Sequence, residues 1–210
     1  MKYSAPSGSL LKGKMTMKVG FIGLGIMGRP MSKNLLKKGY ELHVYDINLD
    51  SMKEIEEAGG HRHSSGKEVA QHADVIVLML PNSPHVEEAL FGKDGLAEGL
   101  EPGKAVIDMS SIDPIESKNF GQRLSEMGVD FLDAPVSGGE PGAIAGTICV
   151  MVGGSEAVFD KYYDLMKAMS GSVVLCGDVG AGNITKCANQ MVVAANIAAV
   201  GEALVFAKQA

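Results

Sequence analysis

The sequence contains no tryptophan, only three cysteines, and aromatic residues at 5% of its 210 positions. The cysteines, Cys149, Cys176 and Cys187, fit no disulfide or zinc pattern, and we expect reduced thiols in a cytoplasmic protein. No run of Lys and Arg exceeds two residues and the net charge is −6. A nucleic-acid partner is therefore not expected, because a phosphate backbone requires a basic surface. His61 and His63 are spaced like a metal pair but lack a third ligand, so we predict no metal site.

Long uninterrupted apolar runs are absent as well. The most apolar segment, 191–200, is interrupted by Asn196 and followed by Gly201 and Glu202, so it falls short of the roughly 18 apolar residues of a membrane span. We therefore predict a buried helix there and no membrane partner. Residues 1–16 show neither the periodicity of a helix or strand nor the apolar core of a signal peptide, and we expect a flexible extension.

Apolar runs of strand length alternate along the chain with helical patterns. Strands are predicted at 18–23, 41–45, 75–80, 105–109, 129–132, 147–152 and 172–175, and helices at 26–38, 49–58, 66–72, 84–91, 114–127, 156–169 and from 183 to the end. This alternation predicts an α/β fold of the Rossmann type, with a doubly wound, mostly parallel sheet. We assign 17–179 to this domain and 180–210 to the beginning of a long helix.

The first predicted strand leads directly into a G-x-G-x-x-G motif that opens a helix. Gly23 permits a tight turn, Gly25 lets a pyrophosphate approach the backbone, and Gly28 lets the helix pack against the strand. Asp46 ends the second strand, 46 − 28 = 18 residues after the motif, where a carboxylate accepts hydrogen bonds from ribose hydroxyls and repels a 2′-phosphate. The pattern predicts a dinucleotide site that prefers NAD(H) to NADP(H). The predicted loop consists of Gly23, Leu24, Gly25, Ile26, Met27 and Gly28.

Polar and glycine residues follow three further strands, at the sheet edge where ligands bind in such folds. One strand ends in Leu80, Pro81 and Asn82, the next in Ser110 and Ser111, and the third leads to Ser137, Gly138 and Gly139. Backbone N–H groups at the two glycines, beside the Ser137 hydroxyl, suit a carboxylate. Ordinary turn chemistry accounts for Asn82 as well as function does, and for Ser110 better, because both residue types are common in turns.

Lys186, Asn189 and Gln190 share one face of the final helix, at positions i, i+3 and i+4. The rest of that helix is largely Ala, Val, Met and Ile. A lysine in such surroundings either extends its amine to water or is desolvated, in which case its lowered pKa suits proton transfer at neutral pH. Position alone favours the first interpretation.

Three segments occur in an order that resembles the β-hydroxyacid dehydrogenase family: GFIGLGIMGRPMSKNL, DAPVSGGEPGAIAGT and GAGNITKCANQ. The resemblance extends over 17–210. It implies hydride transfer between nicotinamide C4 and the carbonyl carbon of a small acid, with Lys186 as the catalytic acid/base. It further implies that Ser137 and Gly138 bind the substrate carboxylate, supported by Gly139, and that Ser111 touches the cofactor along with Leu80, Pro81 and Asn82.

Asn189 and Gln190 would orient the substrate, although much of the family has asparagine four residues after the lysine, where this sequence has Gln190. The segments PNSPHVEEAL and FDKYYDLMKAMSGSVV are similar to a branch that reduces tartronate semialdehyde (2-hydroxy-3-oxopropanoate) to glycerate. A 3-hydroxyisobutyrate or other small β-hydroxyacid dehydrogenase is the alternative substrate class. A non-catalytic dinucleotide-binding fragment is the alternative of another kind.

The family also implies a homo-oligomer, because its members continue from the long helix into an all-α domain that closes the site and forms the dimer interface. This sequence ends at Ala210, inside that predicted helix. We therefore expect an incomplete helical domain and uncertain activity of the chain by itself.

Overall fold

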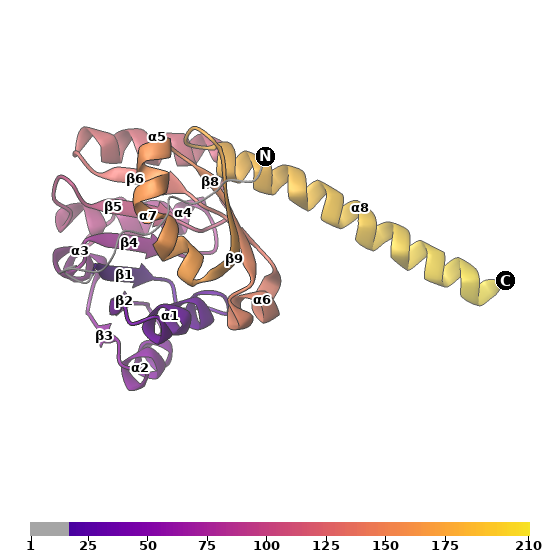
Figure 1. Ribbon diagram of the computed structural model, residues 1–210, viewed down its shortest axis with the longest axis horizontal. Helices are drawn as coiled ribbons and strands as arrows, with labels where there is room; N and C mark the ends of the chain where they lie inside the picture. Colours follow the sequence, from indigo (N-terminus) through magenta and orange to yellow (C-terminus); the bar gives the residue numbers. More distant parts are fainter. Residues whose placement is uncertain (1–16) are drawn as a thin grey trace, which may run out of the picture.

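The computed structural model describes residues 17–210, so the predicted extension over 1–16 lies outside the described residues (Figure 1). Its sheet has the strand order β3-β2-β1-β4-β5-β6-β8-β7, with β9 paired to β8. The strands are β1 Lys18–Ile22, β2 Glu41–Tyr45, β3 His61–Arg62, β4 Val75–Leu78, β5 Ala105–Asp108, β6 Asp130–Asp133, β7 Val136–Ser137, β8 Ile148–Gly153 and β9 Ser170–Gly177. The helices are α1 Gly28–Lys37, α2 Leu49–Glu57, α3 Gly66–His72, α4 Ser83–Phe91, η1 Leu96–Glu98, α5 Pro114–Glu126, α6 Gly139–Ala145, α7 Glu156–Ala168 and α8 Ala181–Gln209.

Helices cover both faces of the sheet, as the doubly wound prediction requires. On one face, α1, α2 and α7 pack on the strands through residues such as Met31, Ile55 and Phe159. On the other, α3, α4 and α5 pack through residues such as Val69 and Leu90. Strands with two covered faces are largely apolar, and every residue of β4 and β5 is buried, including Asp108 at the end of β5.

The predicted fold class is confirmed, and every predicted strand and helix is present within a few residues of its predicted ends. Strands β3 and β7 were not predicted, because two residues are too few to form a pattern. Helix α6 was also missed, because its sequence GEPGAIA begins with glycine and proline, which usually indicate a loop. The sheet is mostly parallel, and β8 runs antiparallel to β6 and β7.

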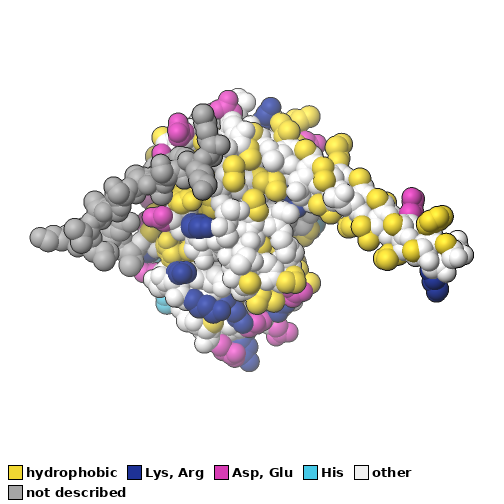
Figure 2. Space-filling view, turned by 45° about the vertical axis from the view of Figure 1, so that its right-hand side comes forward, with side chains coloured by type: hydrophobic (Ala, Val, Ile, Leu, Met, Phe, Trp, Pro, Cys, Tyr) yellow, Lys and Arg dark blue, Asp and Glu magenta, His cyan; other side chains and the backbone are white. Residues whose placement is uncertain are grey.

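The expectation of a buried helix over 191–200 is wrong in one respect. The segment is helical, but α8 extends away from the sheet, and Met191, Ile197 and Phe206 are 75%, 69% and 75% exposed (Figures 1 and 2). Among residues 17–210, α8 is long and apolar enough to cross a membrane by length and composition. Its most apolar 18-residue stretch has a mean hydropathy of 1.6 and no buried residue. A membrane span was not predicted from the sequence because polar residues interrupt the apolar segment.

Candidate functional site

A cavity of about 700 Å³ lies at the carboxyl ends of β1, β2 and β4. Its wall combines the loop after β1, the end of β2, the segment before α3, and the end of β4 with α4. The lining residues include Gly23, Gly25, Ile26, Met27, Gly28, Tyr45, Asp46, Ile47, Ser64, Ser65, Met79, Leu80, Pro81 and His85. The cavity therefore occupies the position at which doubly wound sheets bind nucleotides.

The three motif glycines have different surroundings that match their predicted roles. Gly23 has φ +96°, and a Cβ there would lie 2.2 Å from the Met79 carbonyl oxygen. A Cβ on Gly28 would lie 1.8 Å from the Gly23 carbonyl oxygen, so the helix approaches the loop too closely for any side chain. A Cβ on Gly25 would meet nothing within 4 Å. Gly25 therefore leaves space that an anion can use beside the amino-terminal end of α1.

Asp46 is held by backbone hydrogen bonds at both carboxylate oxygens. The Leu24 N–H donates to Oδ2 at 2.5 Å, and the Asn48 N–H donates to Oδ1 at 2.7 Å. The first of these bonds joins the glycine loop of β1 to the end of β2. Because each oxygen can accept more than one hydrogen bond, the carboxylate stays available to hydroxyl groups of a ligand in the cavity.

Most residues predicted to bind the cofactor line this cavity, and three do not. Leu24 is fully buried, and its contribution is the N–H bond to Asp46. Asn82 is exposed and caps α4, accepting from the His85 N–H. Ser111 is exposed and outside the lining. The buried neighbour Ser110 instead accepts a hydrogen bond from the Leu80 N–H at 2.9 Å, which fixes the end of β4.

The residues predicted to bind substrate lie outside the lining of the cavity. Ser137 ends β7, Gly138 precedes α6 with φ +141°, and Gly139 begins α6 with φ +62°. Asn189 and Gln190 are joined by a hydrogen bond of 3.1 Å. Within residues 17–210, no hydrogen bond connects the loop at 137–139 to α8. The structure thus places the two groups on separate elements, and their roles stay predictions.

Lys186 is half-buried in the second turn of α8. Burial lowers the pKa of its ammonium group below that of an ordinary lysine, because desolvation disfavours the charged form. Of the two interpretations of this lysine, the desolvated one agrees with this environment.

The contacts that hold the start of α8 were not predicted from the sequence. Asn183 is 1% exposed and forms three hydrogen bonds. Its Oδ1 accepts from the Ile112 N–H, its Nδ2 donates to Ser117 Oγ, and its own N–H donates to Asp133 Oδ2. In the sequence, Asn183 was only a polar residue near a predicted helix start. Its buried role was not predicted because its hydrogen-bond partners are distant in sequence.

Asp108, at the end of β5, is a buried carboxyl group that no sequence motif indicates. Its Oδ1 accepts from the Ser110 N–H, whereas Oδ2 has no partner among the described residues. Burial and the neighbouring Asp133 raise the pKa of Asp108 to about 7. The group is therefore a neutral acid below pH 7 and an unfavourably buried anion above it.

We expect Asp108→Asn to stabilise the protein at pH 8 by roughly 1–3 kcal/mol, the range for a buried polar group without a partner. The folded pKa is raised above the ordinary 3.8, so the wild-type free energy of unfolding falls as pH rises from about 4 to 7. Asparagine does not ionise, so the variant has no such dependence, and its gain in the free energy of unfolding over wild type should shrink at pH 4. Urea unfolding at both pH values measures it, and an equal gain at both would contradict the assignment.

Four histidines form a cluster beside the cavity. The ring centroids of His43 and His61 are 5.2 Å apart and those of His63 and His72 are 4.7 Å apart. His43 Nδ1 and His63 Nε2 are 2.9 Å apart and share a hydrogen bond. The spacing of His61 and His63 in sequence resembled a metal pair, and the missing third ligand argued against a site. Among the described residues no group of three or more His, Cys, Asp or Glu could hold a metal ion.

This cluster should make stability depend on pH. Burial and the neighbouring histidines lower the pKa of His43 and of His63 below the ordinary 6.5. Protons therefore bind the unfolded chain first, and the free energy of unfolding should fall as pH drops below about 6.5. Thermal unfolding between pH 5 and 7.5 measures this, and His63→Gln should flatten the dependence whereas His85→Gln should not. An unchanged slope in His63→Gln would contradict the prediction.

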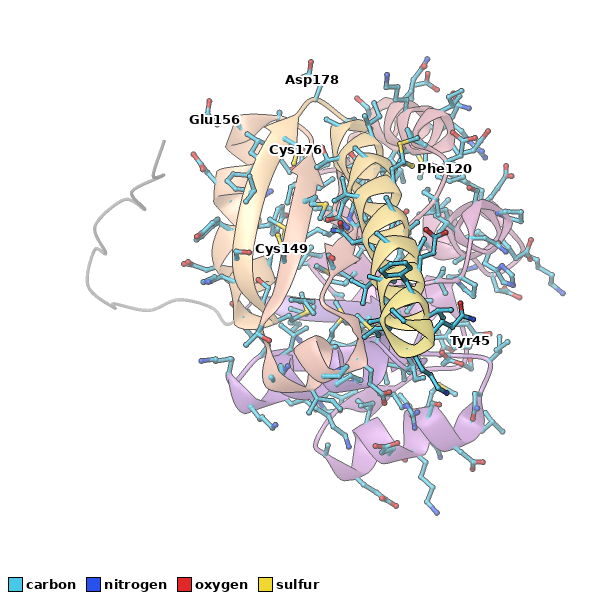
Figure 3. All side chains as sticks on the ribbon, turned by 90° about the vertical axis from the view of Figure 1, so that its right-hand side faces the viewer. Tyr45, Phe120, Cys149, Glu156, Cys176 and Asp178 are labelled. Atoms are coloured by element: carbon cyan, nitrogen blue, oxygen red, sulfur yellow. The ribbon has the colours of Figure 1, made fainter. Side chains whose placement is uncertain are left out.

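All three cysteines are free thiols in the structure. Cys149 and Cys176 lie toward opposite ends of the neighbouring strands β8 and β9 (Figure 3). Cys187 is exposed on α8.

Comparison with known proteins places this geometry among related chains. Residues 18–177 match the NAD binding domain of 6-phosphogluconate dehydrogenase. The chain is 47% identical over 194 residues to 2-hydroxy-3-oxopropionate reductase of Escherichia coli (strain K12), covering 92% of this chain and 66% of that protein. It is 44% identical over 186 residues to mitochondrial 3-hydroxyisobutyrate dehydrogenase of Homo sapiens, covering 89% and 55%. The chain therefore spans about half to two thirds of the length of these relatives.

Solved structures agree with the sequence matches. The 3-hydroxyisobutyrate dehydrogenase of Mycobacterium tuberculosis, with L-serine, superposes with a TM-score of 0.87 at 34% identity, covering 93% of this chain and 66% of that chain. Two structures of imine reductase from Myxococcus stipitatus, a V8 variant in complex with NAD+ and the enzyme in complex with NADP+, share the fold at 21% identity, with TM-scores of 0.83 and 0.81 and coverage of 90% and 89% of this chain.

Proposed function

The chain belongs to the β-hydroxyacid dehydrogenase family, and from this membership we propose that it forms the dinucleotide-binding part of an NAD(H)-dependent oxidoreductase acting on small hydroxyacids. The open space at Gly25 beside the helix start, together with the doubly anchored Asp46, is the observation that carries the proposal. These features fit a pyrophosphate and a ribose, respectively. The glycine loop would hold the pyrophosphate, and Asp46 would accept from the ribose hydroxyls.

The proposed reaction reduces an aldehyde to an alcohol. When bound, NADH supplies a hydride from nicotinamide C4. The Ser137 hydroxyl and the Gly138 N–H would hold the substrate carboxylate, and Gly139 would support that loop. Lys186 Nζ would donate a proton to the oxygen of the aldehyde as its carbon is reduced, and would recover that proton from solvent. The lowered pKa of Lys186 supports this role, because a proton donor works best with a pKa near the working pH.

We propose tartronate semialdehyde as the substrate and glycerate as the product. The 47% identity to a 2-hydroxy-3-oxopropionate reductase supports this choice. The 44% identity to 3-hydroxyisobutyrate dehydrogenase supports methylmalonate semialdehyde as the second candidate. Comparison of kcat/KM for the two aldehydes distinguishes them. NADH binding without turnover of either would favour a dinucleotide-binding part that needs further chain for activity.

The proposed preference for NADH rests on Asp46. We expect wild type to bind NADH more tightly than NADPH, because the carboxylate repels a 2′-phosphate. Asp46→Ala should weaken NADH binding by about tenfold or more, given that a hydrogen bond to a charged group contributes roughly 1.5–3 kcal/mol. The same change should strengthen NADPH binding. Fluorescence titration measures both, with Asp50→Ala as a control on the neighbouring turn, and a wild type that favours NADPH would refute the preference.

A further inference from the structure

Asp133 is a buried carboxylate that contacts the start of α8 from the end of β6. It has no solvent exposure. Its Oδ1 accepts from the Gly180 N–H at 2.6 Å, and its Oδ2 accepts from the Asn183 N–H at 2.8 Å. The Gly182 N–H donates to the same carboxylate. One side chain thus satisfies most of the free N–H groups at the first turn of a helix that runs from Ala181 to Gln209.

No residue of α8 itself performs this capping. The residue before the helix is Gly180, with φ +96° and no side chain to accept a hydrogen bond. A negative charge at this end also interacts favourably with the positive end of the helix dipole. The start of α8 is therefore determined by a residue on the sheet, 47 positions earlier in sequence.

The space around the Asp133 carboxylate is closed. A Cβ on Gly153 would lie 2.3 Å from Oδ1, and a Cβ on Gly182 would lie 2.9 Å from Oδ2. These two glycines leave room for the carboxylate and no more. It therefore cannot shift without moving β8 or α8, so it holds the helix in one position.

Asp133 also begins the segment that leads to the predicted substrate loop. The peptide that follows it is fixed on both sides: the Ala134 N–H donates to the Asp108 carbonyl at 2.7 Å, and the Met151 N–H donates to the Pro135 carbonyl at 3.0 Å. Ser137 stands four residues after Asp133. Lys186 stands six residues after Gly180, within the second turn of α8. One residue thus connects the two elements that carry the predicted substrate loop and the predicted acid/base.

We propose that Asp133 is a positioning residue that sets the place of Lys186 relative to the 137–139 loop through the first turn of α8. The role assigned to Lys186 rests on the proposed function, whereas the contact between Asp133 and α8 does not. Asp133 does not touch the substrate. Its effect is to hold the helix start, so its loss should alter the environment of Lys186 more than the cofactor cavity.

The test compares Asp133→Asn with Asp108→Asn, a matched change of a buried carboxyl on the adjacent strand. The first measurement is the pH dependence of Lys186 modification by acetic anhydride, followed by mass spectrometry, in the full 210-residue chain. In wild type and Asp108→Asn, modification should rise at a lower pH than for an ordinary lysine. In Asp133→Asn the rise should move to higher pH. The second measurement is turnover, where kcat should fall about a hundredfold while the Kd for NADH stays within about twofold.

An unchanged modification profile in Asp133→Asn would overturn the proposal, with or without turnover. If the wild-type chain neither binds NADH nor reduces a semialdehyde, the proposed function fails, and the modification profile still decides the role of Asp133. Should Asp133→Asn not fold, Gly153→Ala provides the second variant. It keeps the carboxylate but places a Cβ 2.3 Å from Asp133 Oδ1, nearer than any backbone atom, and it should shift the Lys186 profile in the same direction. An unshifted profile in a folded Gly153→Ala would equally contradict the proposal.

Discussion

Gly25→Val should weaken NADH binding by about a hundredfold or more while leaving the fold intact. The valine side chain would fill the open space at the start of α1, where the pyrophosphate must approach backbone N–H groups. Losing two hydrogen bonds to a charged ligand, at roughly 1.5 kcal/mol or more each, accounts for that factor. A Cβ at position 25 meets no protein atom within 4 Å, so the melting temperature should change little. Fluorescence titration with NADH and thermal unfolding measure the two quantities.

Gly201→Val is the matched control, because a Cβ on Gly201 also meets nothing within 4 Å and Gly201 lies on the exposed part of α8. It should bind NADH as wild type does. If Gly25→Val kept wild-type affinity, the glycine loop would not be the pyrophosphate site. If Gly25→Val lost both NADH affinity and thermal stability, the valine would be clashing with the protein, and the space at Gly25 would not be open.

Lys186→Ala should reduce turnover of the semialdehyde by roughly 10²–10⁴-fold, the usual contribution of a general acid. The Kd for NADH should stay near the wild-type value, because Lys186 lies outside the cofactor cavity. Lys186→Arg should also lose turnover, since a guanidinium does not give up its proton. NADH oxidation followed at 340 nm in parallel with binding measures the effect.

The pH profile adds a second test of the same residue. A proton donor must be protonated, so reduction should slow as pH rises through the pKa of Lys186. Burial lowers that pKa, and the decline should therefore come at a lower pH than for an exposed lysine. Lys208→Ala, an exposed lysine in the last turn of the same helix, should keep both the rate and the profile. Normal turnover in Lys186→Ala would show that Lys186 is not the proton donor.

The parts of the molecule that sequence predicts well are those determined by local pattern. The glycine loop could be predicted because Gly23 and Gly28 meet backbone atoms that belong to the same βα unit or its neighbour. Asp46 could be predicted because it ends the adjacent strand at a fixed spacing. The position of the cavity follows from these two features, because both lie at the carboxyl ends of neighbouring strands.

The features that sequence analysis missed depend on contacts between distant segments. Asp133 reaches Gly180 across 47 positions, and its capping role has no local pattern. The histidine cluster forms only when β2 and α3 bring His43 and His72 together. The exposure of α8 was mispredicted for a related reason. Its apolar composition indicated a covered helix, and no element within residues 17–210 packs against its outer length.

NADH binding to the cavity is tested most directly by amide NMR on the 210-residue chain. We expect chemical-shift changes in the loop 23–28, at 46–48, at 64–66 and at 79–81, with residues beyond 190 in α8 unaffected. That pattern would place the dinucleotide in the cavity at the strand ends. If saturating NADH shifts none of these amides, or shifts only amides elsewhere in the chain, the cavity is not the dinucleotide site.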